Sequence, residues 1–254
     1  MTWFIRCALA LSVASVGCGP QLGTIAVEPS VPTPKSAKRI AAHDEILCDR
    51  ILENFDATSE GAFPSKWHTR SASDKPIAIE TEAYVVRREG ERNVLHATYR
   101  DQPITIALPV DDWDLEQYPI LQWSWRAVVL PPGADEREGA TNDSAAGVYV
   151  IWEIGVPFMI RSVKYAWSST LPVGTTVSRR LGHDHVVVMS SGREPSDGWR
   201  TTRVNVKEHY RELFERDELE RPSGIAILTD ADSTGTQAEA YYADFRLCRV
   251  VQPH

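Results

Sequence analysis

The stretch Ile120–Val129, ILQWSWRAVV, alternates between apolar and polar side chains. Positions 121, 123, 125, 127 and 129 are apolar, whereas 122, 124 and 126 are polar. A period of two is typical of a β-strand with one face on a hydrophobic core and the other face toward solvent. We therefore predict a strand here, with Trp123 and Trp125 packed on its core side.

The same period recurs along the chain after residue 44. Further strands are predicted at 83–88, 93–99, 104–108, 147–155, 162–168, 185–190, 199–206, 224–229 and 240–250. Loops rich in Pro, Gly and Asp separate these short runs, which favours an all-β, antiparallel β-sandwich over βαβ units. One short helix is predicted at 207–214, where apolar residues form a stripe. Residues 38–53 are expected to form a short helix or an irregular lead-in.

Composition narrows the functional classes. The chain has 254 residues, 43% of them hydrophobic, and includes eight Trp, so it can bury a sizeable core. A net charge of −8, with no basic cluster beyond Lys35–Arg39, argues against nucleic-acid binding. The longest apolar stretch falls short of the roughly 20 residues that span a bilayer. The familiar hydrolase, phosphate-loop and dinucleotide motifs are absent from the sequence, so an enzyme is less favoured than a binding protein.

The N-terminus has the anatomy of an export signal. Residues 1–17 carry Arg6, then an apolar run and small residues. The run Ser15-Val16-Gly17-Cys18 resembles the bacterial lipobox, which implies a lipid on Cys18 and attachment to a membrane. No Asp follows Cys18, which implies the outer membrane of the bacterial envelope, facing the periplasm or the cell surface. The alternative is an ordinary secretory signal.

Two further segments follow the signal. Residues 18–43 contain four prolines and no aromatic residue, so they are predicted to form a semi-rigid tether. Residues 44–254 are predicted to form a single domain.

Five blocks of sequence carry a resemblance to a known family. They are ILENFDATSEGAFPSKW, LQWSWRAVVLPPGADEREGATNDSAAGVYVIWE, KYAWSS, DGWRTTRVNVKEHYRELF and IAILTDADSTGTQAEAYYADFRL. In this order they resemble the uncharacterised bacterial exported family known as domain of unknown function 3047, over about residues 50–250. The first and last blocks are also similar to the galactose-binding-like jelly rolls of carbohydrate-binding modules. The resemblance implies a jelly-roll sandwich and leaves the activity open.

The polar positions of two predicted strands are candidates for ligand binding. Arg126 lies opposite the face of Trp125, and Tyr149 and Glu153 alternate with buried positions of the 147–155 strand. Together with Asp143, just ahead of that strand, they are predicted to form one polar sheet face that binds a ligand. The alternative is a solvated or ion-paired surface.

A second candidate follows the apolar run Ile225–Leu228. Asp230 and Asp232 stand in D-x-D-x-T-G, which resembles the first half of a calcium loop with alternating oxygen ligands. The twelfth position is Tyr241 in place of the bidentate Glu. We therefore expect either a calcium site of different geometry or a plain turn built by Asp and Gly. No other cofactor is predicted.

These features favour a lipid-anchored, non-catalytic sandwich that binds a glycan or another envelope component. One alternative is an envelope hydrolase with acid and base groups among Asp143, Glu153, Asp230 and Asp232. Another is a structural envelope protein with no small ligand. The oligomeric state is left open.

Two cysteines are predicted to form a disulfide. Cys7 leaves with the signal and Cys18 carries the lipid, so Cys48 and Cys248 remain in an oxidising compartment. The jelly-roll resemblance adds that the first and last strands are neighbours. The alternative is two separately buried thiols.

Overall fold

A computed structural model describes residues 45–155, 159–192 and 198–251 of the chain. The predicted signal peptide, the tether and Cys18 lie outside these residues. Within them, no helix is both long enough and apolar enough to cross a membrane.

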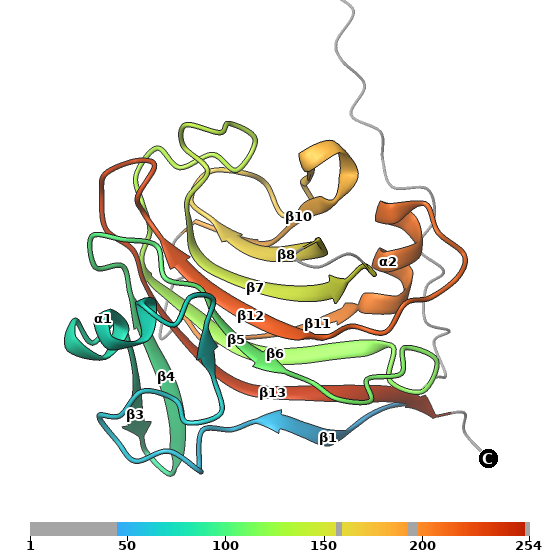
Figure 1. Cartoon of the computed structure of the whole chain (residues 1–254), viewed down its shortest axis with the longest axis horizontal. Helices are drawn as coiled ribbons and strands as arrows, with labels where there is room; N and C mark the ends of the chain where they lie inside the picture. The colour runs from blue at the N-terminus through green and yellow to red at the C-terminus, as the bar shows by residue number, and fades with distance from the viewer. Residues whose placement is uncertain (1–44, 156–158, 193–197, 252–254) are drawn as a thin grey trace, which may run out of the picture. The chain divides into compact units, whose positions relative to one another are not determined.

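The strands form two sheets (Figure 1). The first sheet has the order β11-β6-β13-β4-β3, and β1 also pairs with β13. Its strands are β1 (Glu45–Glu53), β3 (Tyr84–Glu89), β4 (Arg92–Thr98), β6 (Ile120–Val129), β11 (Arg200–Asn205) and β13 (Glu239–Val251).

The second sheet has the order β2-β5-β12-β7-β8-β10-β9. Its strands are β2 (His68–Thr69), β5 (Ile106–Pro109), β7 (Ser144–Glu153), β8 (Ile160–Ser168), β9 (Thr176–Arg179), β10 (Asp184–Ser191) and β12 (Gly224–Asp230). Neighbouring strands of both sheets pair antiparallel, apart from the parallel pair β8 and β10. The predicted all-β, antiparallel β-sandwich is confirmed.

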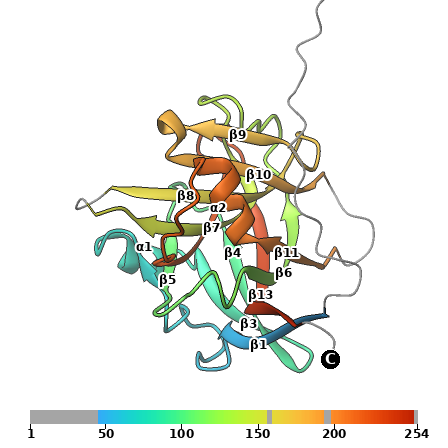
Figure 2. The ribbon, with the colours of Figure 1, turned by 90° about the vertical axis from the view of Figure 1, so that its right-hand side faces the viewer.

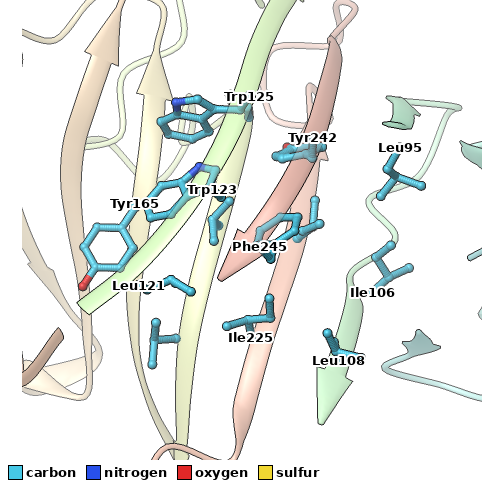
Figure 3. Packing of buried hydrophobic residues seen from close by; sticks show 14 of the residues in the cluster. Leu95, Ile106, Leu108, Leu121, Trp123, Trp125, Tyr165, Ile225, Tyr242 and Phe245 are labelled. Carbon is cyan, nitrogen blue, oxygen red and sulfur yellow. The ribbon is translucent and has the colours of Figure 1, made fainter. Parts of the chain in front are cut away.

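Aromatic side chains fill the space between the sheets. Trp123 and Trp125 of β6 are fully buried, with ring centroids 5.2 Å apart in an edge-to-face arrangement. Trp123 faces Tyr165 of β8 with ring centroids 5.6 Å apart (Figure 3). The ring centroids of Trp125 and Trp167 are also 5.6 Å apart. The contacts of Trp125 with Trp123 and Trp167 are edge-to-face, so the positive edge of one ring meets the negative face of the other, whereas the Trp123 and Tyr165 rings are tilted by 38°. Because these rings take up the core side of β6 and β8, the side chains that alternate with them point away from the core, on opposite faces of the sandwich.

The helix α2 (Val206–Phe214) confirms the predicted helix. The Asn205 side chain caps its start by accepting the backbone N–H of Glu208, and Glu215 ends it in the left-handed conformation. Tyr210 and Phe214 pack on Trp152 of β7. Figure 2 shows the ribbon of α2 in orange beside β7. The helix thereby covers one end of the core with its apolar stripe.

Several segments differ from expectation, and the short strands β2 and β9 were not predicted. Residues 45–53 form the strand β1, not a helix or an irregular lead-in, because they pair with β13 from Glu45–Val251 to Glu53–Phe245. The pattern of apolar and polar residues within a segment does not reveal pairing with a strand that is distant in the sequence. The helix α1 (Asp74–Glu80) was not predicted, since its seven residues bury only Ala78 and leave Ile77 and Ile79 exposed.

The predicted disulfide is confirmed. Cys48 of β1 is bonded to Cys248 of β13, with the two Cα atoms 3.9 Å apart. The bridge joins the first strand to the last across a sequence separation of 200 residues.

Replacing both cysteines with alanine should lower the free energy of unfolding by about 2 to 5 kcal/mol, because the open chain gains conformational entropy when unfolded. Urea denaturation of the wild type with and without reductant measures the same difference. Two titratable thiols per chain in the exported, unreduced protein would contradict the bridge.

Candidate functional site

Three carboxylates meet where β7 begins and β12 ends. Asp143 directly precedes β7, Asp230 is the last residue of β12, and Asp232 follows two residues later. The antiparallel pair Asp230–Ser144 brings these points together. One oxygen from each carboxylate lies within 4.8 Å of the others, and we call this group the acidic corner. The structure thus adds Asp143 to the two predicted metal ligands.

Asp143 braces the loop that carries Asp232. Its side chain is fully buried and accepts the backbone N–H groups of Ser233, at 3.1 Å, and Thr234, at 2.7 Å. It also accepts the Thr234 hydroxyl at 2.6 Å. The N–H of Asp232 bonds to Asp230 Oδ1 at 3.3 Å, so the turn-building interpretation describes part of what these residues do.

The acidic corner also suits a hard cation. Each carboxylate oxygen has two lone pairs, so one that accepts an N–H can still coordinate a metal. Carboxylate oxygens are the ligands that Ca²⁺ prefers. Asp143, Asp230 and Asp232 could therefore hold calcium, and the calcium expected from the sequence stays a prediction.

Asp230 is a mostly buried carboxyl group of the corner. Only 7% of its surface is exposed. Burial raises its pKa to about 7, and the negative charge of Asp232 adds to the rise, while Lys164 opposes it. Perturbed carboxyl groups of this kind cluster at functional sites.

Lys164 of β8 reaches toward the corner across the neighbouring strand. It is 5% exposed, and its register partner on β7 is Tyr149. A Cβ on Gly147 would lie 2.9 Å from Lys164 Cε and 3.3 Å from the Leu228 carbonyl oxygen. A glycine at 147 therefore leaves the space through which the lysine passes. The Lys164 ammonium lies 5.8 Å from the centroid of the half-buried Tyr149 ring.

Arg126 lies elsewhere, on the outer face of the first sheet. Its guanidinium is 4.3 Å from the Tyr241 ring and 5.0 Å from the Trp199 ring, and it pairs with Glu89 at 2.6 Å. Tyr241 in turn stacks on His96 with centroids 4.6 Å apart. We call Trp199, Arg126, Tyr241 and His96 the ring–cation row.

The predicted single polar face is therefore wrong. Arg126 belongs to the first sheet, Tyr149 belongs to the second, and each turns away from the shared core. Glu153 ends β7, at the opposite end of that strand from Asp143, and is exposed. Of the predicted ligand residues, Asp143 and Tyr149 are brought near Asp230 and Asp232, whereas Arg126 and Glu153 are not.

Sequence reasoning missed Lys164 and Gly147. A signal was present in each case, because a lysine in the apolar run VKYAW and a glycine in the run AAGVYV are both unusual inside buried strands.

Comparison with models of protein families assigns the chain to a family. The model of a family described as "Protein of unknown function (DUF3047)" matches residues 65–246. The chain belongs to this family. The family resemblance found in the sequence is thus confirmed for this DUF3047 chain. No match to it is found among curated proteins.

Several solved structures are similar to the DUF3047 chain. One is a family 11 carbohydrate-binding module from Clostridium thermocellum in complex with a mixed-linked tetrasaccharide, with 8% identity and a TM-score of 0.41, covering 78% of this chain and 94% of the module. The K2 adhesin domain of Lys-gingipain has 10% identity and a TM-score of 0.39, with 80% and 97% covered. Endoglucanase 3 of Trichoderma harzianum has 10% identity and a TM-score of 0.36, with 83% and 99% covered.

Asp230→Asn should change how the stability of the DUF3047 chain depends on pH. The pKa of Asp230 is about 7 in the folded protein and about 4 in the unfolded chain, so the unfolded chain loses this proton at lower pH than the folded protein does. The free energy of unfolding of the wild type therefore falls as the pH rises from about 4 to about 7, and above pH 7 the folded protein carries a costly buried charge. Asparagine stays neutral. The variant should therefore be more stable than the wild type at pH 8.5, by about 1 to 3 kcal/mol, and gain little at pH 4.

Urea denaturation in chelator at both pH values measures this difference, with the distant, exposed Glu153→Gln as matched control. An Asp230→Asn variant that is no more stable than the wild type at pH 8.5 would contradict the buried, proton-holding carboxyl.

Proposed function

We propose that this protein is a non-catalytic, glycan-binding β-sandwich, and that its binding surface consists of the acidic corner, Tyr149 and Lys164. The observation that supports this proposal is the mixture of groups in one small area. A half-buried aromatic ring lies beside an ammonium donor and beside carboxylate acceptors. A sugar offers both hydroxyl donors and acceptors around a ring with apolar C–H faces, so it can bind the exposed carboxylate of Asp232 and the ring of Tyr149, while the mostly buried Asp143, Asp230 and Lys164 hold this surface in place from below.

The groups are also held in place before any ligand arrives. Asp143 fixes the loop of Asp232 with three hydrogen bonds, and Lys164 is confined by its neighbours over Gly147. Side chains that are ordered in the free protein lose little entropy on binding, which favours affinity. The acidic character of this surface also argues against a nucleic acid as partner.

A glycan-array screen of the processed, full-length chain tests the proposal. We expect a restricted set of glycans to bind, and we expect Tyr149→Ala and Asp232→Asn each to weaken the best of them about tenfold, the loss that one good polar or stacking contact causes. Glu153→Gln is the matched control and should bind normally. Arms with calcium and with chelator show whether the ion contributes. Unchanged binding in both variants, or no bound glycan at all, would contradict the proposal.

One observation favours a second function, that of an envelope hydrolase. Asp230 holds a proton near neutral pH beside other carboxylates, and a carboxyl group kept protonated in this way can act as a general acid. The same array-selected glycan separates the two functions. Release of new reducing ends by the wild type, abolished in Asp230→Asn, would assign catalysis. Stable binding without release supports the binding protein.

We also propose that the domain is held at the bacterial outer membrane by a lipid on Cys18, which rests on the lipobox-like run of the sequence alone. Acyl chains add about 0.8 kcal/mol per buried methylene, so several chains hold firmly. Cys18→Ser should release the protein into the soluble periplasmic fraction or leave an unprocessed precursor. Unchanged membrane partition together with an unchanged mature mass would contradict lipidation.

A further inference from the structure

We propose a second binding site, for a single sugar ring, in a hollow beside the ring–cation row on the first sheet. The ligand class rests on the proposed function, but the residues are different ones. The hollow has a volume of about 170 Å³. It is lined by His96, Thr98, Tyr99, Arg100, Val129, Gln237, Ala238 and Glu239.

The side chains that line the hollow favour a ligand with hydrogen-bonding groups around its ring. All but two of its side chains, those of Val129 and Ala238, can form hydrogen bonds. A larger hollow of about 340 Å³ near α1 is the opposite case, since Ala62, Phe63 and Val85 are among its lining residues. Pockets for drug-sized ligands begin at roughly 300 Å³, so the smaller, polar hollow suits one sugar ring.

The ring–cation row holds one wall of the hollow in place. His96 Nε2 is 2.9 Å from Glu239 Oε1 and 3.3 Å from the Thr98 hydroxyl. The His96 ring cannot tilt freely, because it is stacked on Tyr241 with an angle of 24° between the ring planes. Arg126 covers Tyr241 and is itself fixed by its ion pair with Glu89. The wall is therefore rigid before a ligand binds, which lowers the entropic cost of binding.

Two groups on this wall are left for a ligand. Glu239 Oε1 is engaged by His96, whereas Oε2 has no hydrogen-bond partner in the described part of the chain. Arg100 is exposed and has no carboxylate partner among residues 45–155, 159–192 and 198–251. A carboxylate acceptor and a guanidinium donor on one small hollow match the adjacent hydroxyls of a sugar, and charged partners make the stronger hydrogen bonds.

Tyr99 connects the hollow to the acidic corner. Its backbone N–H donates to the Ala238 carbonyl at 3.0 Å, which ties it to the segment between β12 and β13. Burial raises the pKa of Tyr99, and the charges of Asp232 and Asp230 raise it further, so its hydroxyl lies within their field. The hollow and the acidic corner thus flank the same segment, 231–238. One glycan that touched both would gain avidity from the linked contacts.

Saturation-transfer NMR on the processed, full-length chain tests the second site, with methyl glycosides of glucose, galactose, mannose and N-acetylglucosamine as probes. We expect at least one probe to receive saturation from the wild type. Arg100→Ala and Glu239→Gln should each weaken that probe's affinity about tenfold. Lys75→Ala, in the apolar hollow, is the matched control and should leave the affinity unchanged.

Asp232→Asn separates this proposal from the proposed function. It should weaken the array-selected glycan while leaving the small probe bound, because the probe occupies the hollow alone. No saturation of any probe, or full affinity in both Arg100→Ala and Glu239→Gln, would overturn the second site. Failure of the glycan array with a positive probe result would overturn the acidic-corner surface and leave the hollow standing.

Discussion

The packing of four large rings between the sheets sets the arrangement of the molecule. Trp123 and Trp125 of β6 meet Tyr165 and Trp167 of β8, and all four are fully buried. With one side of each strand committed to this contact, the other side must face outward. The outer face of the first sheet then receives Arg126 and Tyr241, while that of the second receives Tyr149 and Lys164. Both candidate sites follow from this division.

Buried carboxylates do two different things in this protein. Glu53 accepts the Phe55 N–H and the Trp67 indole N–H, and Glu136 accepts the hydroxyls of Ser144 and Ser168. Like Asp143, these acids brace loops by satisfying buried donors. Asp230 differs, because it accepts one weak hydrogen bond and lies beside another carboxylate. The pKa of Asp230 is raised because its buried charge lacks enough hydrogen-bond partners to offset the loss of water. For this reason we propose the acidic corner, and not the other buried carboxylates, as a binding surface.

Local pattern in the sequence predicted much of the fold. The period of two located β6 and the other central strands, and the two remaining cysteines predicted the bridge between β1 and β13. The same pattern could not assign strands to sheets, because alternation says whether a residue points outward but not from which face. Arg126 and Tyr149 were therefore grouped wrongly. Asp143 and Asp230 were each visible as candidates, yet only the pairing of β7 with β12 makes them one site.

Mapping a bound glycan onto the chain by NMR tests the central claim most directly. The probe is the best glycan from the array, titrated into the uniformly ¹⁵N-labelled, processed protein. Binding at the acidic corner predicts that the largest shifts fall on the backbone amides of Lys164, Ser233 and Thr234, with little change at Glu153. Shifts that concentrate at the Glu153 end of β7 and leave residues 231–236 unmoved would contradict the account.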